Sequence, residues 1–357
     1  MTRAGTVKCV VWDIDNTLLD GVYLESGDQP PAADPVLAGV LAQLGGRGIL
    51  HALASKNPPE AAAHTARVTG WQFAAAECGW DSKSAALARI AAGLGIGIDT
   101  LAFVDDDPYE RAEVGSALPQ VLVLSPEEAA EAAGWPEFSP PVVTAEARGR
   151  GQMYAQRQRR QAAGRAFAGT REAFLRAAGT EVTIAAATSA DVPRLHELAL
   201  RTRQFNSAAG QPAGGEATQE WFTQLLSARD HDVVTVRLRD TFGDDGVVGG
   251  CVIAHEPGTW TVPLLMMSCR AMGRGVIDAV LAWLIRQAAR AGAGQLRIPC
   301  TANTRNVPLR LALAAAGLRA PHAGGPGPAV YQRDLSGTLP ALPAGVRAPG
   351  EPPGEGQ

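Results

Sequence analysis

Residues 10–21 read VVWDIDNTLLDG, an apolar run that stops at two acidic residues. The run Val7–Trp12 has the composition of a buried strand, and Asp13 and Asp15 follow it directly. Two carboxylates separated by one residue can bind a hard cation such as Mg²⁺, through the first side chain and the backbone carbonyl of the second residue. The same spacing leaves Asp13 able to attack phosphorus and Asp15 able to carry a proton. Taken alone, the pattern also fits an ordinary acidic turn.

Short apolar runs alternate with alanine-rich stretches as far as about residue 124. The predicted strands are Val7–Trp12, Ile49–Ala54, Gln72–Ala75, Leu101–Val104 and Val121–Leu124. The helices predicted between them lie near Pro35–Leu44, Pro58–Thr69, Ser82–Ala92 and Glu110–Ser116. One helix between successive strands predicts crossover connections, and therefore an α/β fold with a doubly wound parallel sheet. In such sheets the functional residues collect at the carboxyl ends of the strands.

Polar residues stand where the other predicted strands end. The second strand is followed by Ser55-Lys56-Asn57, whose hydroxyl and amide can hold phosphoryl oxygens, and the fourth by the acidic run Asp105-Asp106-Asp107. Lys83 opens the helix after the third strand, where its ammonium can neutralise a phosphate and a carboxylate. Only three of the 32 basic residues are lysine, which favours a specific role for a retained one. A helix cap, a surface lysine and an acidic turn would explain each feature singly, but their order along the chain is hard to assign to chance.

This set of motifs resembles that of the haloacid dehalogenase (HAD) superfamily, and DxDxT is typical of its phosphatases and phosphotransferases. The resemblance implies a catalytic role for Asp13 as nucleophile, for Asp15 as acid and base, and for Lys83 as a phosphate-binding cation. It implies that substrate is bound by Thr17, Ser55, Lys56 and Asn57. It implies Mg²⁺ as cofactor, with Asp13, Asp15 and either Asp105 or Asp106 as the candidate ligands. Because only 38 residues separate Thr17 from Ser55, we expect a minimal cap and an open site that suits a bulky or protein-borne substrate.

Composition excludes several other classes of protein. A chain of 357 residues predicts two domains, and its formal charge of −4 and pI near 5.9 argue against a nucleic-acid binder. No apolar run is long enough to span a membrane, and residues 1–8 do not resemble a signal peptide, so we expect a soluble cytoplasmic protein. The five cysteines are odd in number and widely spaced, which predicts neither a disulfide framework nor a metal site.

The second half has a different pattern. We assign residues 1–140 to the HAD-like domain and residues 141–180, which are rich in arginine, to a helical connector. Residues 181–335 form the second domain, and residues 336–357, rich in proline and glycine, are predicted to be a disordered tail. The elements predicted within the second domain are strand Val182–Ala186, helices Asp191–Arg201 and Gln219–Leu226, strands Asp232–Leu238, Val247–His255 and Thr259–Met267, and a helix from near Gly275.

A narrower resemblance covers most of residues 7–335. It is to the FkbH-like proteins of polyketide pathways, in which a HAD domain precedes an α+β domain similar to the GNAT acyltransferases. The stretches that carry it are VVWDIDNTLLDG (10–21), ASKN (54–57), GWDSKS (79–84), LAFVDDDPYERAEV (101–114), TRQFN (202–206), FGDDGVVG (242–249), MSCRAMGRGV (267–276) and NVPLR (306–310). The resemblance implies a glyceryl transferase and phosphatase that takes a glyceryl group from 1,3-bisphosphoglycerate. The acceptor would be the phosphopantetheine arm of an acyl carrier protein.

The motif RAMGRG (270–275) matches the RxxGxG phosphate loop of GNAT proteins, between a predicted strand and a helix. Arg270, Gly273 and Gly275 are therefore candidate substrate-binding residues, because glycines let backbone amides face a phosphate. An ordinary strand–turn–helix is the alternative. Cys269 precedes the loop and is our candidate acyl carrier, with Cys78 as its rival and a structural role as the alternative for either. We assign Cys9, Cys251 and Cys300 to packing.

One departure from the family bears on function. Leu313 stands where the family's aromatic-rich helix often carries the tyrosine that serves GNAT enzymes as general acid, which counts against amine acetylation. Two other functions remain open: a plain phosphatase of a small phosphoester, with the second domain as a lid, and a non-catalytic module that docks a carrier protein.

Overall fold

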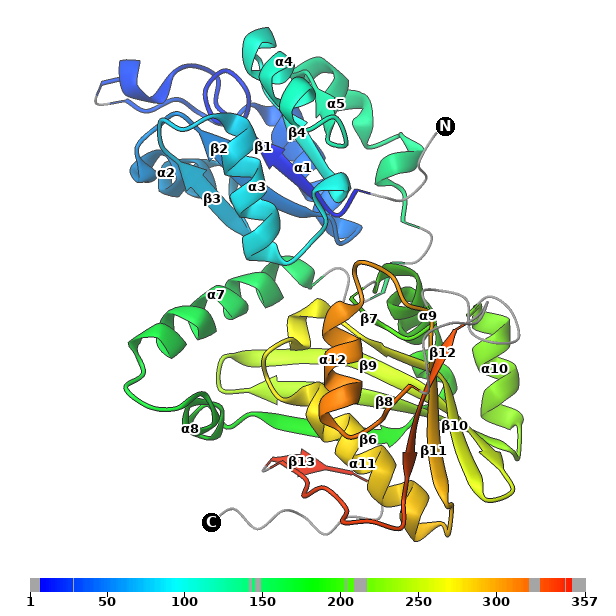
Figure 1. Ribbon diagram of the computed structural model, residues 1–357. Helices are drawn as coiled ribbons and strands as arrows, with labels where there is room; N and C mark the ends of the chain where they lie inside the picture. The colour runs from blue at the N-terminus through cyan, green and yellow to red at the C-terminus, as the bar shows by residue number, and fades with distance from the viewer. Residues whose placement is uncertain are drawn as a thin grey trace. The chain divides into compact units, whose positions relative to one another are not determined.

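The chain divides into two units, residues 1–159 (unit 1) and residues 160–357 (unit 2), and each is built around its own sheet (Figure 1). The computed structural model describes residues 7–27, 29–140, 143–144, 149–202, 204–208, 217–320, 328–343 and 345–348. The division between the units falls inside the segment that the sequence predicts to be a helical connector.

Unit 1 contains a parallel five-stranded sheet in the order β3-β2-β1-β4-β5. The strands are β1 (Cys9–Trp12), β2 (Leu50–Ser55), β3 (Ala75–Cys78), β4 (Leu101–Val104) and β5 (Leu122–Leu124). The chain winds outward from β1 to β3 and then returns to place β4 on the other side of β1. The strand order therefore reverses beside β1, which is where open α/β sheets bind their ligands. The predicted doubly wound parallel sheet is confirmed.

Helices cover both faces of this sheet. Alternate residues of β1 point to opposite faces, and because all four are apolar or buried, each face needs a covering layer. Val10 and Trp12 lie in a core that includes α1 and α5, whereas Cys9 and Val11 lie in a core that includes α3. The helices of unit 1 are α1 (Pro35–Gly46), α2 (Pro59–Thr69), α3 (Lys83–Leu94), α4 (Pro108–Ala117) and α5 (Pro126–Ala132), with short 3-10 helices η1 (Tyr23–Glu25), η2 (Ile98–Thr100) and η3 (Pro136–Phe138).

Two features of unit 1 bear on the sequence analysis. Strand β3 begins three residues later than the predicted Gln72–Ala75, because the residues that pair with β2 are Ala75–Cys78. That register places Cys78 beside Ser55, at the carboxyl ends of both strands. Between β1 and α1, the described residues 17–27 and 29–34 contain only η1 and isolated bridges, which agrees with a minimal cap.

Unit 2 contains a mixed sheet in the order β12-β11-β10-β9-β8-β6-β13, with β7 paired to β10. Its strands are β6 (Glu181–Ala186), β7 (Phe205–Asn206), β8 (His231–Asp240), β9 (Gly243–Glu256), β10 (Thr259–Met267), β11 (Gln295–Cys300), β12 (Ala329–Asp334) and β13 (Val346–Arg347). Strands β10 and β11 are parallel and pair over residues 259–261, whereas residues 266–267 at the end of β10 pair with β7 instead. The two strands thus separate, and β7 lies against the separated end of β10.

Helices pack on both faces of the second sheet. The core with α11 and α12 lies on one face, and the core with α9 and α10 lies on the other. The helices are α7 (Arg150–Ala166), which crosses the division between the units, α8 (Arg171–Ala177), α9 (Val192–Arg201), α10 (Gln219–Ser227), α11 (Val276–Arg290) and α12 (Val307–Ala315), with 3-10 helices η4 (Ser189–Asp191) and η5 (Cys269–Ala271). Across the described residues, no helix is both long and apolar enough to cross a bilayer.

The predicted disordered tail begins at residue 336, and the structure describes residues 336–343 and 345–348 of it. Val346 and Arg347 form β13, which pairs in parallel with β6, and Val346 is buried. Leu339 and Leu342 pack against the core that contains Val346. A few apolar residues spaced among prolines are enough to hold this segment on the sheet edge. Residues 349–357 lie outside the described part of the chain.

Candidate active site

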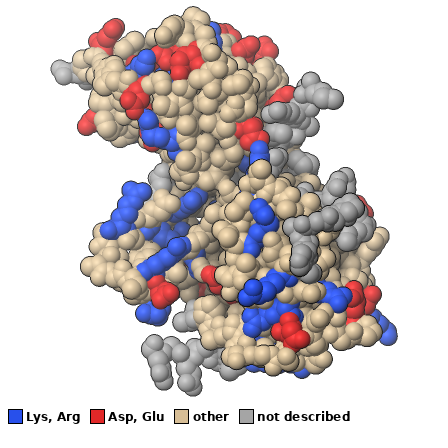
Figure 2. All heavy atoms as spheres, in the orientation of Figure 1, with Lys and Arg blue, Asp and Glu red and all other residues tan. Residues whose placement is uncertain are grey.

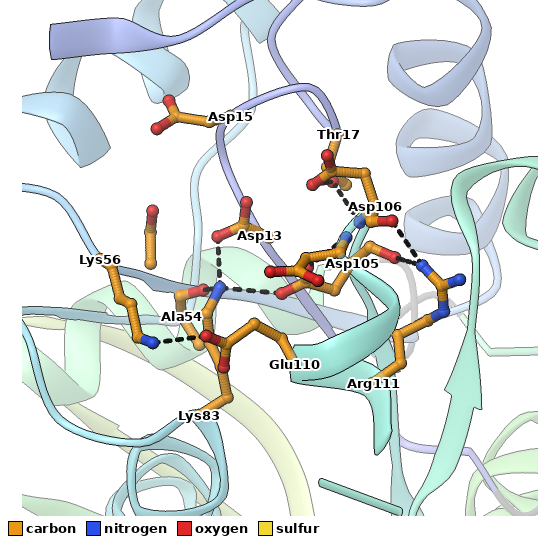
Figure 3. A network of polar contacts seen from close by, with 12 residues as sticks. Asp13, Asp15, Thr17, Ala54, Lys56, Lys83, Asp105, Asp106, Glu110 and Arg111 are labelled. Carbon is orange, nitrogen blue, oxygen red and sulfur yellow. Dashed lines mark hydrogen bonds and ion pairs between the residues drawn. The ribbon is translucent and has the colours of Figure 1, made fainter. Parts of the chain in front are cut away.

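The end of β1 brings Asp13 to the carboxyl edge of the sheet (Figure 3). The Asp13 N–H donates to the Val104 carbonyl of β4 at 2.9 Å, which fixes the first residue after the strand. The chain then turns through Asn16, whose φ of 50° lies in the left-handed region that asparagine tolerates better than most residues. The two aspartates of the DxDxT motif, which both precede this turn, have different hydrogen-bond partners.

Lys83 is the first residue of α3, and its ammonium lies among buried acceptors. It donates to Asp13, to Oδ2 of Asp105 at 2.9 Å, and to the Ala54 carbonyl at 2.8 Å. The side chain is only 4% exposed, so all three ammonium donors are used without water. Ser82 caps the helix by accepting from the Ala85 N–H, which fixes where the lysine begins its reach. The structure thus brings together three residues that the sequence separates by up to 92 positions.

Burial controls the ionisation of this group. It raises the pKa of Asp13 to about 6, against the opposing effect of Lys83, and it also raises the pKa of Asp105. Burial acts to lower the pKa of Lys83, but the two carboxylates raise it above its ordinary value. One ammonium faces two buried carboxylates, so the fully ionised cluster carries one negative charge in excess. A bound cation would remove that excess.

Asp13, Asp105 and Asp106 form a group that can hold a metal ion. One carboxylate oxygen from each lies within 4.8 Å of the others. Hard oxygen donors of this kind are the ligands that Mg²⁺ prefers. The acidic loop is held by Arg111, whose Nη1 donates to the carbonyls of Asp105 and Asp106 at 2.7 Å each. The donor set therefore fits a magnesium ion.

Asp15 lies apart from this group of ligand atoms. Its Oδ1 accepts from the Tyr23 N–H at 2.9 Å, and its Oδ2 accepts from Nδ2 of Asn57 at 2.8 Å. Figure 3 shows its carboxylate turned away from Lys83. Asp13, Asp105 and Asp106 thus bring their carboxylates together, whereas the carboxylate of Asp15, which is predicted to bind the cation through its backbone carbonyl, lies elsewhere. That arrangement leaves Asp15 available for proton transfer.

The predicted phosphate-binding residues have distinct surroundings. The Ser55 hydroxyl is buried and accepts from Nδ2 of Asn57 at 3.0 Å. Thr17 is also buried, and its hydroxyl donates to Asp106 at 3.4 Å and accepts from the Asp106 N–H at 3.2 Å. Thr17 therefore supports the acidic loop through its hydroxyl. Lys56 forms an ion pair with Glu110 of α4.

Sequence reasoning missed two residues of this site, Glu110 and Arg111. Both lie on α4 directly after the acidic run, in the stretch YERAE (109–113). In the sequence, these two residues are adjacent and oppositely charged, and they lie in the first turns of a helix that begins at Pro108, at the carboxyl edge of the sheet. That pattern could have indicated their place in the site. Glu110 is buried, which is uncommon for a glutamate unless it is paired.

In unit 2, the RxxGxG stretch lies between β10 and α11 as predicted. Gly273 and Gly275 both have left-handed φ values, 75° and 71°, which glycine adopts without strain. A cavity of about 360 Å³ lies beside them. It is lined by Arg171, Glu172 and Leu175 of α8, Phe205 of β7, Met267 of β10, and Ala271, Met272, Gly273, Gly275, Val276, Ile277 and Asp278. Arg171 joins α8 to the loop by donating from Nε to the Gly273 carbonyl at 2.8 Å.

The other charged residues of this loop point elsewhere. Arg270 is buried and donates to the Ser268 hydroxyl at 3.3 Å, and it is not among the residues that line the cavity. Arg274 forms ion pairs with Asp240 and Asp245 in the interior, beside Arg160 of α7. Asp245 belongs to the stretch FGDDGVVG that carries part of the family resemblance. Asp245 of that stretch, together with Asp240 just before it, therefore holds Arg274 inside the unit.

The five cysteines are all free thiols. Cys269 is half-buried at the start of η5 and does not line the cavity. Cys78 is half-buried at the end of β3, and burial raises the pKa of its thiol. Cys9, Cys251 and Cys300 are buried in the cores, where burial likewise raises the pKa of each thiol.

The chain is similar to several solved structures. No family model matches the chain, and no curated protein matches it. One similar structure is the N-terminal part of BF1531 from Bacteroides fragilis, which contains a phosphatase domain complexed with Mg. It is 26% identical over 36% of this chain and 38% of that one, with a TM-score of 0.32.

A second is the 3-deoxy-D-manno-octulosonate 8-phosphate phosphatase from Moraxella catarrhalis, in complex with magnesium, phosphate and its sugar. It is 25% identical over 31% of this chain and 63% of that one, with a TM-score of 0.27. A third is an aminoglycoside acetyltransferase in complex with coenzyme A, which is 15% identical over 43% of this chain and 95% of that one, with a TM-score of 0.33. The chain spans less than two thirds of the length of both phosphatase structures. The solved structures that this chain resembles thus include phosphatase domains as well as acetyltransferases.

Proposed function

We propose that unit 1 is a Mg²⁺-dependent phosphatase site of the HAD type, with Asp13 as its nucleophile. The observation that carries this proposal is the buried contact of Lys83 with both Asp13 and Asp105, next to Asp106. Lys83 places an ammonium between two carboxylates at the switch point of a parallel sheet. If this position served only for packing, an apolar side chain would fill it better. The buried ammonium fits a site that takes up an anionic group and a cation together.

Asp13, Asp105 and Asp106 would hold the Mg²⁺ ion. When bound, the ion supplies positive charge that offsets the developing negative charge on the phosphoryl oxygens. Ser55 orients the phosphoryl group by donating to one of its oxygens, and the positive charge of Lys83 beside Asp13 attracts that group to the site. Arg111 keeps the acidic loop in place through the two backbone carbonyls.

The chain's own residues can carry out both halves of hydrolysis. An oxygen of Asp13 attacks phosphorus and forms an aspartyl phosphate, while the bond from phosphorus to the leaving oxygen breaks and Asp15 donates a proton to that oxygen. Asp15 then takes a proton from water, whose oxygen attacks the same phosphorus. Inorganic phosphate leaves and the Asp13 carboxylate is regenerated.

For the whole chain, we propose the reaction that the FkbH-like resemblance implies: transfer of a glyceryl unit from 1,3-bisphosphoglycerate to an acyl carrier protein for polyketide-type biosynthesis. A thiolate attacks the acyl carbon, the bond from that carbon to the phosphate oxygen breaks, and phosphate leaves. The pantetheine thiol then takes the acyl group from the resulting thioester and returns a thiol to the enzyme. Unit 1 removes the phosphate ester at the other end of the glyceryl unit. A free thiol carrier requires a reducing compartment, which favours the cytoplasm.

Two features of unit 2 support a carrier-protein partner. The cavity beside Gly273 and Gly275 has room for a slender arm, and the turn can offer backbone amides to a phosphate. Unit 2 holds 20 basic and 16 acidic residues, a net charge of +4, whereas unit 1 holds 12 and 20, a net charge of −8. Figure 2 shows Lys and Arg side chains gathered on the face of unit 2 that it draws. An acidic partner would be attracted to unit 2 rather than unit 1.

A plain phosphatase of a small phosphoester is the second candidate. The observation that favours it is the position of Cys269, which is not among the residues that line the cavity. In that case unit 2 would serve as a lid or as a docking module.

One experiment separates the two candidates. The protein is incubated with Mg²⁺, 1,3-bisphosphoglycerate and a carrier protein bearing phosphopantetheine, and released phosphate and intact masses are measured. A carrier protein heavier by one glyceryl unit supports transfer. Phosphate release without any mass gain on the carrier supports the plain phosphatase, and no Mg²⁺-dependent phosphate release would exclude both.

A further inference from the structure

Helix α12 of unit 2 carries almost no polar side chains. Its sequence, VPLRLALAA (307–315), contains a single polar residue, Arg310. Leu309 and Leu313 are fully buried and hold the helix on the core that also includes α11 (Figure 1). A helix that is apolar on every side is normally buried on every side, because surface helices turn polar residues outward. Helix α12 is instead exposed on the side that faces away from the core.

The exposed side of α12 is an apolar surface. Because successive helical residues are turned by about 100°, Leu311 points directly away from Leu309 and Leu313. It is 65% exposed, and Val307, one turn before it, is 41% exposed. We call this surface the outer face of α12, and it consists of the exposed residues Val307, Leu311, Ala314 and Ala315. Exposed apolar residues that lie together, rather than singly, mark a surface at which another molecule binds.

The sequence around α12 is strongly cationic. Residues 279–333 include seven arginines and no aspartate or glutamate. Arg305 and Arg319 are exposed and stand just before and just after the helix, and Arg310 is half-buried on its flank. An acidic helix with apolar side chains on one face complements this surface. Its apolar side chains would pack on the outer face, and its carboxylates would meet the arginines.

The sizes of the side chains favour a helix over a lipid surface as the occupant. Val307 and Leu311 form a short ridge, whereas Ala314 and Ala315 leave room for the ridge of a second helix, which is how helices pack closely. A helix that lies in a membrane surface carries bulky residues such as Trp, Phe and Leu on its inserted face. Two of the four residues of the outer face are alanines, so it lacks that character.

Strand β7 connects this helix with the cavity beside the glycine turn. Phe205 of β7 lines the cavity. The carbonyl of Asn206, the other residue of β7, accepts from Nδ2 of Asn306 at 3.5 Å, and Asn306 directly precedes α12. The start of α12 and the cavity therefore share a two-residue strand. A partner on the outer face would lie near the cavity in which its arm is proposed to bind.

We infer that the outer face of α12 is a docking surface for an acidic amphipathic helix of a partner protein. The inference rests on the carrier-protein partner proposed for unit 2. It assigns the part of this chain that the body of that protein contacts, as distinct from its phosphopantetheine arm. Leu311 is the central apolar contact, and the arginines around α12 orient the acidic helix.

A carrier protein that lacks its phosphopantetheine arm tests this surface without the cavity. We expect the full-length protein to bind this apo carrier protein with a Kd that rises with salt, because the charged contacts are screened. Leu311→Gln should raise the Kd about ten-fold or more, as expected for a residue at the centre of an interface. Its melting temperature should stay at the parent value, since Leu311 is exposed and glutamine is a good helix former. Isothermal titration calorimetry at low and at physiological salt measures the Kd.

Matched variants separate the two kinds of contact. Leu200 is a 49% exposed leucine of α9, a helix on the other face of the same sheet, so Leu200→Gln should bind like the parent protein. Joint replacement of Arg305 and Arg319 by glutamine should weaken the salt dependence of the Kd. Arg237→Gln removes a cation from an exposed ion pair with Asp191 and should leave that dependence unchanged.

Each outcome decides the inference. An unchanged Kd in Leu311→Gln, or no binding of the apo carrier by the parent protein, would overturn it even if the carrier that bears phosphopantetheine gains a glyceryl unit. It would also be overturned if the parent protein forms dimers or binds vesicles of anionic lipid and Leu311→Gln does neither, because the outer face would then serve another occupant. The transfer proposal fails separately if the carrier that bears phosphopantetheine gains no mass although the apo carrier binds.

Discussion

The side chain of Asp13 is the residue on which the proposed chemistry depends. It is buried, bonded to Lys83, and part of the carboxylate group that can hold a metal. Asp13→Asn should lower phosphate release by about 10³-fold or more, because an amide does not attack phosphorus and removes one negative charge from the metal site. The measurement is Mg²⁺-dependent phosphate release from para-nitrophenyl phosphate. Asp81→Asn, at an exposed ion pair, is the control. Turnover close to the parent level in Asp13→Asn would exclude Asp13 as the nucleophile.

The same residue gives a pH dependence of stability in the absence of metal. Burial raises the pKa of Asp13 from an ordinary value of 3.8 to about 6. Between about pH 4 and pH 6 the folded state therefore keeps a proton that the unfolded state has lost, so this group makes the free energy of unfolding fall as pH rises. In the presence of a chelator, we expect the melting temperature of the parent protein to fall relative to that of Asp13→Asn as pH rises through this window. At pH 7, added Mg²⁺ should raise the melting temperature of the parent protein again. If the melting temperatures of the two proteins change with pH in the same way, the raised pKa assigned to Asp13 is wrong.

At the scale of elements, α8 and the turn before α11 are joined by a contact that depends on glycine. Gly273 has a φ of 75°, and a Cβ there would lie 2.1 Å from Nη2 of Arg171. Gly273→Ala should therefore combine backbone strain of about 1–2 kcal/mol with a clash that forces Arg171 off the loop. We expect a lower melting temperature and loss of carrier-protein binding.

Gly258 provides the matched control, since its φ is 70° and nothing lies within 4 Å of a Cβ built there. Gly258→Ala should cost only the backbone strain. Adding Arg171→Ala to Gly273→Ala should recover the part of the loss that comes from the clash, so the two changes should not be additive. Equal losses in the two glycine variants would show that α8 does not restrain the loop.

Elements also show which parts of the fold can be read from sequence. The carboxyl ends of parallel strands meet at one edge, so polar residues after β1, β2 and β4 were expected to gather there, and Asp13, Ser55 and Asp105 do so. Glu110 and Arg111 were not foreseen, because their roles depend on how the first turn of α4 faces that edge. The two-residue strand β13 was missed for a similar reason: its pairing with β6 is non-local and leaves no periodic pattern in the sequence.

At the scale of the whole molecule, the question is whether the phosphate chemistry proposed for unit 1 and the thiol chemistry proposed for unit 2 belong to one reaction. The motifs at the strand ends predict the first, whereas Cys269 is predicted as an acyl carrier from its place before the RxxGxG loop, near Arg270 and the start of a helix. The structure adds one observation on each of the rival thiols. Burial raises the pKa of Cys78, which lowers the share of its reactive thiolate at neutral pH. Cys269 stands beside the glycine turn that is proposed to hold the pantetheine phosphate.

If Cys269 carries the acyl group, Cys269→Ser should still bind the carrier protein but should form no glyceryl thioester on it. A serine hydroxyl without a general base is a poor nucleophile, and an ester formed there would donate slowly to a thiol. Phosphate release from para-nitrophenyl phosphate should persist in this variant, because Asp13 lies in unit 1. Intact mass of the enzyme and of the carrier protein measures loading and delivery. Cys78→Ser, at the end of β3 beside Ser55, is the matched control and should retain delivery. Delivery lost in Cys78→Ser but kept in Cys269→Ser would reverse the assignment, and delivery kept in both would mean that the acyl group passes directly from the phosphate to the pantetheine thiol.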